Sequence, residues 1–225
     1  MQEVLPNNSD NTNFREISIF DSIICELESS LSILSGKVQS HRPNPSIKIN
    51  DEYLLSEEEK LLVSRLMRIN HVGEICAQAL YRGQAFACKD KNIKDLFISA
   101  SIEEIDHLVW CRQRIRELDG RTSILGPFWY ISSFLLGLIA SFYGSSVNLG
   151  FMSETEKQVE AHLEKHLNLI PHFDSKSRSI LLQMQEDEIH HKEVADNAGA
   201  DDLSYFSKIS MKIMSKFMTK LTYWL

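Results

Sequence analysis

The stretch EEIDH at residues 103–107 recurs with little change as DEIHH at residues 187–191. In each copy a glutamate precedes a histidine by three positions, which gives the pairs Glu104–His107 and Glu188–His191. Positions i and i+3 of an α-helix lie on one face about one turn apart, so the two side chains of a pair point the same way. A carboxylate and an imidazole on one face form half of a transition-metal site. A single copy is more typical of a solvent-exposed helix face, whereas two copies indicate a shared site.

The helices that precede the two motifs supply further candidate ligands. In helical bundles that hold a carboxylate-bridged metal pair, two helices each contribute a Glu and the other two each contribute Glu-x-x-His. Glu74 precedes Glu104, and Glu160 precedes Glu188, at nearly equal spacings that describe two helical hairpins. We therefore predict six metal ligands and, from their chemistry, two iron ions in preference to manganese or zinc. The predicted ligands are Glu74, Glu104, His107, Glu160, Glu188 and His191.

Several neighbours of these residues have weaker signals. His71 lies three positions before Glu74, where it could hydrogen-bond a ligand or could equally be a buried packing histidine. Glu103 and Asp187 each precede a ligand histidine by four positions, and we interpret them as helix-surface pairs. No spacing requires a role for Tyr81. Four histidines belong to no motif and are interpreted as surface residues: His162, His166, His172 and His190.

Composition and periodicity predict an all-α protein. The 225 residues allow one domain with appendages, and a net charge of −7 argues against nucleic acid as a partner. No segment alternates with a period of two, and a capping box at Ser56 and Glu59 begins a long helical pattern. We predict a ferritin-like four-helix bundle within residues 51–200, after an N-terminal region, 1–50, with a disordered tail, a short helix and a linker. The predicted helices are 17–34, 56–88, 91–118, 152–169 and 174–197.

The segment between the two hairpins, residues 122–153, contains no charged residue. Its centre is long and apolar enough to be a transmembrane candidate. One crossing would place the two half-sites on opposite sides of a membrane, and two crossings need about 40 residues, more than the segment has. The segment is therefore a membrane-facing insert that enters and returns or lies in the interface, or else a buried crossover.

The C-terminal residues, 201–225, form a predicted basic amphipathic helix. Four lysines recur every fourth position with no acid among them: Lys208, Lys212, Lys216 and Lys220. Apolar residues occupy the other faces, and Tyr223 and Trp224 close the helix with aromatic rings. This pattern favours a helix on an anionic membrane surface, with docking onto a protein partner as the alternative.

With these motifs in view, residues 17–225 resemble the bacterial type of the demethoxyubiquinone hydroxylase family. The resemblance is carried by LMRINHVGEICAQALYRGQA, SIEEIDHLVWCRQRIRELDGR, SETEKQVEAHLEKHL, DEIHH and MTKLTYWL, and by the apolar segment from PFWY to GLIASFYG. The family's iron ligands map onto the same six residues that the spacing selects. Two departures, the serines at 145–146 and Lys192, affect no predicted ligand.

The resemblance implies an O2-dependent di-iron monooxygenase of ubiquinone biosynthesis. Its substrate would be a polyprenylated methoxy-methyl-benzoquinol, its electrons would come ultimately from a reduced nicotinamide nucleotide, and other proteins of the same pathway are candidate partners. A substrate that resides in lipid implies a peripheral protein on the cytoplasmic face of the bacterial inner membrane. Two alternatives of other classes share part of this pattern: a ferritin-type iron store, and a metal-free lipid-binding bundle. A di-manganese catalase is a third alternative among enzymes.

Overall fold

The computed structural model describes residues 18–50 and 54–225. In that part of the chain there are seven α-helices and no strand, which confirms the all-α prediction. The helices are α1 (Ile19–Leu34), α2 (Glu57–Ala87), α3 (Lys91–Glu117), α4 (Gly126–Ser141), α5 (Ser145–Leu169), α6 (Ser175–Asn197) and α7 (Tyr205–Trp224). The predicted N-terminal tail and the first residue of the predicted helix 17–34 lie outside the described residues.

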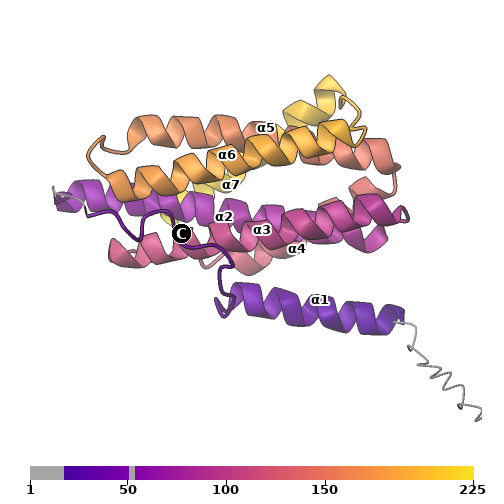
Figure 1. Ribbon diagram of the computed structural model, residues 1–225, viewed down its shortest axis with the longest axis horizontal. Helices are drawn as coiled ribbons and strands as arrows, with labels where there is room; N and C mark the ends of the chain where they lie inside the picture. The colour runs from indigo at the N-terminus through magenta and orange to yellow at the C-terminus, as the bar shows by residue number, and fades with distance from the viewer. Residues whose placement is uncertain (1–17, 51–53) are drawn as a thin grey trace, which may run out of the picture.

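Two helical hairpins, α2–α3 and α5–α6, form the four-helix bundle. Figure 1 shows α5 and α6 side by side along one edge of the molecule and α2 and α3 beneath them. Helix α4 packs along α2 on its outer side, and α7 contacts α2 and α5. Helix α1 lies at the periphery, where it contacts α2 and α4. The bundle thus brings its four long helices around one central axis, with the additional helices on the outside.

Local sequence sets most of the helix ends. The Ser56 hydroxyl accepts a hydrogen bond from the Glu59 backbone N–H (3.3 Å), and the Glu59 carboxylate accepts one from the Ser56 N–H (2.8 Å), which confirms the predicted capping box. Gly199, with φ +97°, follows the end of α6. The third bundle helix begins earlier than the predicted residue 152, because Gly144 adopts φ +98° and a helical segment follows it directly.

Helix α4 is only half buried. Tyr130 is buried against α2 and Trp129 is buried beside Phe217 of α7, whereas Ile131, Leu135 and Ile139 are at least half exposed. The uncharged segment is therefore not a crossover buried on all sides. Within the described residues, no helix combines the length and apolarity that a membrane crossing requires.

The apolar core divides into two main clusters along the bundle axis. One contains Met67, Trp110, Leu163 and Met184, and the other contains Tyr81, Phe97, Leu149 and Met152. Each of the four bundle helices contributes to both clusters. The residues between the clusters along every helix are those of the predicted metal site, so the site occupies one polar layer inside an apolar bundle.

Candidate metal centre

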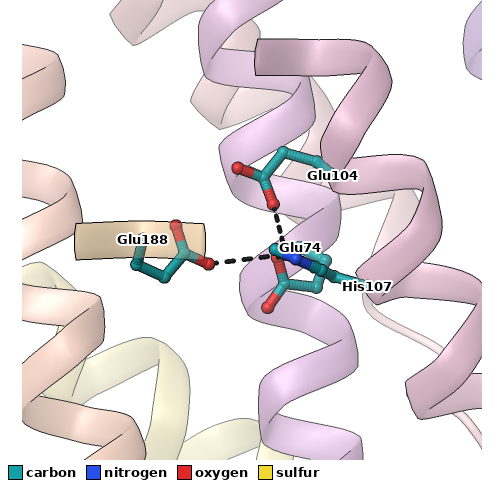
Figure 2. A group of neighbouring side chains, drawn as sticks. All are labelled: Glu74, Glu104, His107 and Glu188. Carbon is teal, nitrogen blue, oxygen red and sulfur yellow. Dashed lines mark hydrogen bonds and ion pairs between the residues drawn. The ribbon is translucent and has the colours of Figure 1, made fainter. Parts of the chain in front are cut away.

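Side chains from all four bundle helices meet in that polar layer. One group combines Glu74 of α2, Glu104 and His107 of α3, and Glu188 of α6; its ligand atoms lie within 4.8 Å of one another (Figure 2). A second group, by the same measure, comprises Glu104, Glu156, Glu188 and His191. Glu104 and Glu188 belong to both groups. The geometry therefore describes two adjacent positions that share two carboxylates.

Each histidine points its Nδ1 atom into the cluster. His107 Nδ1 lies 3.1 Å from Glu104 Oε2, 3.5 Å from Glu188 Oε1 and 3.7 Å from Glu74 Oε2. His191 Nδ1 lies 3.4 Å from Glu104 Oε1 and 3.6 Å from one oxygen each of Glu156 and Glu188. Both Glu-x-x-His motifs thus converge on one centre, as the i, i+3 argument predicts.

The sixth predicted position is different in the structure. Glu160 is half buried and belongs to neither group, whereas Glu156, one turn earlier on α5, is fully buried within the second group. The spacing to Glu188 alone could not show whether Glu156 or Glu160 is the ligand, because residues four positions apart lie on the same face of a helix. The apolar residues of α5 could have identified the right position. Leu149, Met152 and Leu163 are buried, and their heptad-like spacing places residue 156, but not residue 160, on the same buried face of the helix.

Unpartnered atoms show that the cluster fits metal ions. Buried oxygens of Glu104, Glu156 and Glu188 and the Nδ1 of His191 lack a hydrogen-bond partner among the described residues. Several buried carboxylates with unsatisfied oxygens are costly unless cations lie among them. Four carboxylates and two imidazoles form a hard-to-intermediate donor set that suits iron or manganese.

Burial and mutual contacts set the protonation of the cluster. Burial raises the pKa of Glu74 and of Glu156 well above the usual range. Burial alone would also raise the pKa of Glu104 and Glu188, but contacts with His107 and His191 outweigh it and lower both values. Burial disfavours protonated His107 and His191, yet their carboxylate partners raise both pKa values.

Carboxylates from the opposite hairpin fix both histidine rings. His107 Nε2, on α3, lies 2.8 Å from Asp187 Oδ2 on α6. His191 Nε2, on α6, lies 3.0 Å from Glu103 Oε2 on α3. The interpretation of Glu103 and Asp187 as helix-surface pairs is therefore wrong. The first acidic residue of each motif orients the histidine of the other motif and so directs its Nδ1 into the ligand cluster.

Three further residues differ from, or add to, the sequence interpretation. The buried Tyr81 hydroxyl donates a hydrogen bond to Glu156, a contact that spacing did not reveal. His71 is buried, and burial together with the charge of Arg112 lowers its pKa to about 3, in keeping with a packing role. His166 is buried and His162 is half-buried, so neither is a fully exposed surface residue; burial lowers their pKa values to about 3 and about 4, respectively. His172 and His190 are exposed, as expected.

A cavity of about 800 Å³ adjoins the metal layer at Glu74. Side chains of α2, α4, α5 and α7 line it, and most of them are apolar, among them Leu80, Phe128 and Phe217. Two polar side chains in its wall have buried atoms with no hydrogen-bond partner in the described chain: both amide atoms of Asn70, and Nε2 of His162. An elongated apolar molecule with a polar ring could therefore reach Glu74 from the side where α4 and α7 lie.

Comparisons with known proteins show the family to which the chain is related. Residues 61–222 match the family model described as "Ubiquinone biosynthesis protein COQ7". A protein of Bordetella pertussis named 3-demethoxyubiquinol 3-hydroxylase is 48% identical over 211 residues, which cover 94% of this chain and 95% of the relative. A Coxiella burnetii protein of the same name is 46% identical over 213 residues, covering 95% of this chain and 99% of the relative.

Proposed function

This chain belongs to the ubiquinone biosynthesis protein COQ7 family, and we propose that it hydroxylates the ring of a prenylated demethoxyubiquinol with O2. Its similarity to the named 3-demethoxyubiquinol 3-hydroxylases extends over nearly the whole length of both chains. The enzyme class therefore rests on the family, and the residues that carry the reaction are proposed from the geometry of this chain.

Six side chains would hold the metal pair. His107 and Glu74 would complete one position, His191 and Glu156 the other, and Glu104 and Glu188 would be shared. Two irons bound there would supply the electrons that activate O2, with a reduced nicotinamide nucleotide as the proposed ultimate donor. The protein's own contribution is to orient the donor atoms. Asp187 and Glu103 do this for the histidines, and Tyr81 holds Glu156.

The observation that carries the proposal is the contact between the apolar cavity and the metal layer at Glu74. An iron store has no need of an apolar cavity of this size beside its metal ligands, and a metal-free lipid carrier would not bury these carboxylates and histidines together. The unpartnered amide of Asn70, one turn before Glu74, can both donate to and accept from a quinol ring oxygen. We infer that Asn70 and His162 bind the ring while the prenyl chain extends between α4 and α7.

We further propose that α4 and α7 rest on the cytoplasmic surface of the bacterial inner membrane. Both helices expose large apolar side chains: Ile131 and Ile139 of α4, and Ile213 and Phe217 of α7, which also line the cavity. Lys212, Lys216 and Lys220 are exposed on α7, whereas Lys208 pairs with Asp202 and is half buried. Three lysines of the predicted stripe, rather than four, are thus available to anionic lipid.

Metal analysis and product mass test the proposal together. Protein purified without oxygen and reconstituted with ferrous iron should bind two irons per chain. Given a short-chain demethoxyubiquinol, a chemical reductant and ¹⁸O2, it should form a product heavier by one ¹⁸O atom, attached to the ring. Retention of two irons with ferrous oxidation but no product would favour an iron store. Substrate binding without any bound metal would favour a lipid carrier.

A further inference from the structure

The segment between α1 and α2 lies across the bundle beside the metal layer. We call residues 38–50 the strap; Figure 1 shows this stretch as a dark trace that runs over the helices before α2 begins. Arg112 of α3 donates a hydrogen bond to the Val38 carbonyl (3.1 Å), and the Asn44 amide donates one to Gln113 (2.7 Å). The strap is therefore attached along α3, in the region that the sequence predicts only as a linker.

Arg42 is the strap residue that reaches the metal centre. Its Nε donates to Asp106 Oδ2 at 2.8 Å, and its two terminal nitrogens donate to both oxygens of Asp187 at 3.1 and 2.7 Å. The guanidinium also lies 5.0 Å from the centre of the Trp110 ring. The backbone N–H of His41 adds a 2.6 Å hydrogen bond to Asp106. One rigid fork thus connects α3, α6 and the strap.

The contact matters because of what Asp187 does. The Asp187 oxygen that accepts from Arg42 at 2.7 Å also lies 2.8 Å from His107 Nε2. The Asp106 and Asp187 side chains are 3% and 14% exposed, so two poorly hydrated carboxylates share one cation. Without that cation the carboxylates would repel each other, and Asp187 would gain by turning toward water and away from His107.

The second half of the centre has no comparable brace among the described residues. Glu103, the partner of His191 Nε2, has a side chain that is 42% exposed, and its other hydrogen bond comes from the Ser99 hydroxyl at 3.4 Å. The two Glu-x-x-His motifs are nearly identical in sequence, yet the strap covers only the His107 side. The sequence repeat therefore gives rise to two structurally different half-sites.

We propose that Arg42 is a positioning residue of the metal centre: held by the strap, it fixes Asp187 and thereby keeps His107 Nδ1 directed at one of the two metal positions. The inference rests on the proposed metal site and adds a residue outside the four-helix bundle to it. It also makes the two positions unequal, with the strapped position more firmly held.

Cobalt(II) titration of the metal-free protein tests this inference without any need for substrate or turnover. Visible absorption should report two equivalents in the wild type. Arg42→Gln should weaken one equivalent by about 10- to 100-fold, the usual effect of losing a residue that orients a metal ligand. Arg42→Lys keeps the charge but not the fork, and should fall between the two. Arg82→Gln is the matched control, because Arg82 makes a two-bonded ion pair with Glu26 of α1. Both equivalents should bind normally to that control.

Double variants show whether Arg42 acts through Asp187. When Asp187→Asn is already present, adding Arg42→Gln should cause little further loss of cobalt affinity. When Glu103→Gln is already present, Arg42→Gln should weaken one cobalt equivalent and Glu103→Gln the other. Wild-type cobalt affinity in both Arg42 variants would overturn the inference, as would an equal further loss in the Asp187→Asn background. If Arg42→Gln does not fold, as judged by circular dichroism, the Lys variant decides: unchanged affinity overturns the inference. A wild-type protein that binds no metal would instead overturn the proposed function.

Discussion

Gly83 of α2 and Gly137 of α4 each lie against the backbone of the other's helix. A Cβ atom on Gly83 would lie 2.1 Å from the Phe134 carbonyl oxygen, and one on Gly137 would lie 2.1 Å from that of Leu80. Neither position has space for a side chain, so the two backbones pack directly on each other. This close crossing fixes α4, one wall of the cavity, against the helix that carries Glu74.

Gly137→Ala should therefore separate α4 from α2. We expect an overpacking cost of about 1–3 kcal/mol in the free energy of unfolding. Hydroxylation should fall much more than iron content, because the cavity wall moves while the ligands stay in the bundle. Gly73→Ala serves as the stability control: nothing lies within 4 Å of its Cβ position, and alanine should raise helix stability by up to about 1 kcal/mol. Urea unfolding of both variants and iron analysis of Gly137→Ala test this; equal stability of the two would contradict it.

Glu156→Ala and Glu160→Ala should distinguish the ligand that the structure indicates from the one that the sequence predicts. Loss of Glu156 should remove metal from the His191 position and lower turnover by at least about a hundredfold, a loss of about 2.7 kcal/mol in transition-state stabilisation. Glu160 lies outside both ligand groups, so its alanine variant should retain two irons and near-normal activity. The measurements are iron stoichiometry and steady-state rates, and the reverse pattern would restore Glu160 as a ligand.

Metal loading should release protons. Raised pKa values favour protonated Glu74 and Glu156 and positively charged His107 and His191 in the metal-free protein. Metal ligands must be deprotonated, so binding two divalent ions at neutral pH should release about four protons. Calorimetry in buffers of different ionisation enthalpy counts them. A release close to zero would show that the four groups are already deprotonated.

The pH dependence of stability should carry a contribution from His166. Burial lowers its pKa from 6.5 to about 3, so the unfolded chain takes up a proton before the folded one does. Stability should therefore fall as the pH drops from about 6.5 toward 3, by about 2 kcal/mol at pH 5 from this residue. His166→Gln should remove that part of the slope, while His172→Gln, at an exposed position, should keep it. Urea unfolding of the metal-free proteins at pH 7.5 and pH 5 makes the comparison, and parallel slopes for wild type and His166→Gln would refute it.

Charge on α7 should contribute to membrane binding in a salt-dependent way. Replacing Lys212, Lys216 and Lys220 together by Gln should weaken binding to anionic vesicles by up to about 1 kcal/mol per lysine at low salt, and little at high salt. Lys208→Gln should have a smaller effect, because Lys208 already pairs with Asp202. Vesicle sedimentation over a salt series is the measurement. A wild-type chain that never sediments with vesicles would contradict the membrane proposal itself.

The sequence predicted the bundle because its signals are local and repeated. The capping box at Ser56, the Gly199 terminator and the two Glu-x-x-His motifs each specify structure within a few residues. Glu156 was missed because choosing between residues one turn apart requires the packing register of α5 on its neighbours. Arg42 could not be found at all from spacing, since its contacts with Asp106 and Asp187 join residues 64 and 145 positions apart. Contacts between an irregular segment and distant residues produce no periodic pattern in the sequence.

The exchange of orienting carboxylates between α3 and α6 has a thermodynamic consequence. Neither hairpin contains a complete half-site, because His107 depends on Asp187 and His191 on Glu103. Bound metal therefore acts as a cross-link between hairpins, and its binding energy adds directly to the cohesion of the fold: at a free concentration of 100 Kd, one ion contributes about 2.7 kcal/mol. Iron starvation would then lower the amount of folded protein as well as its turnover.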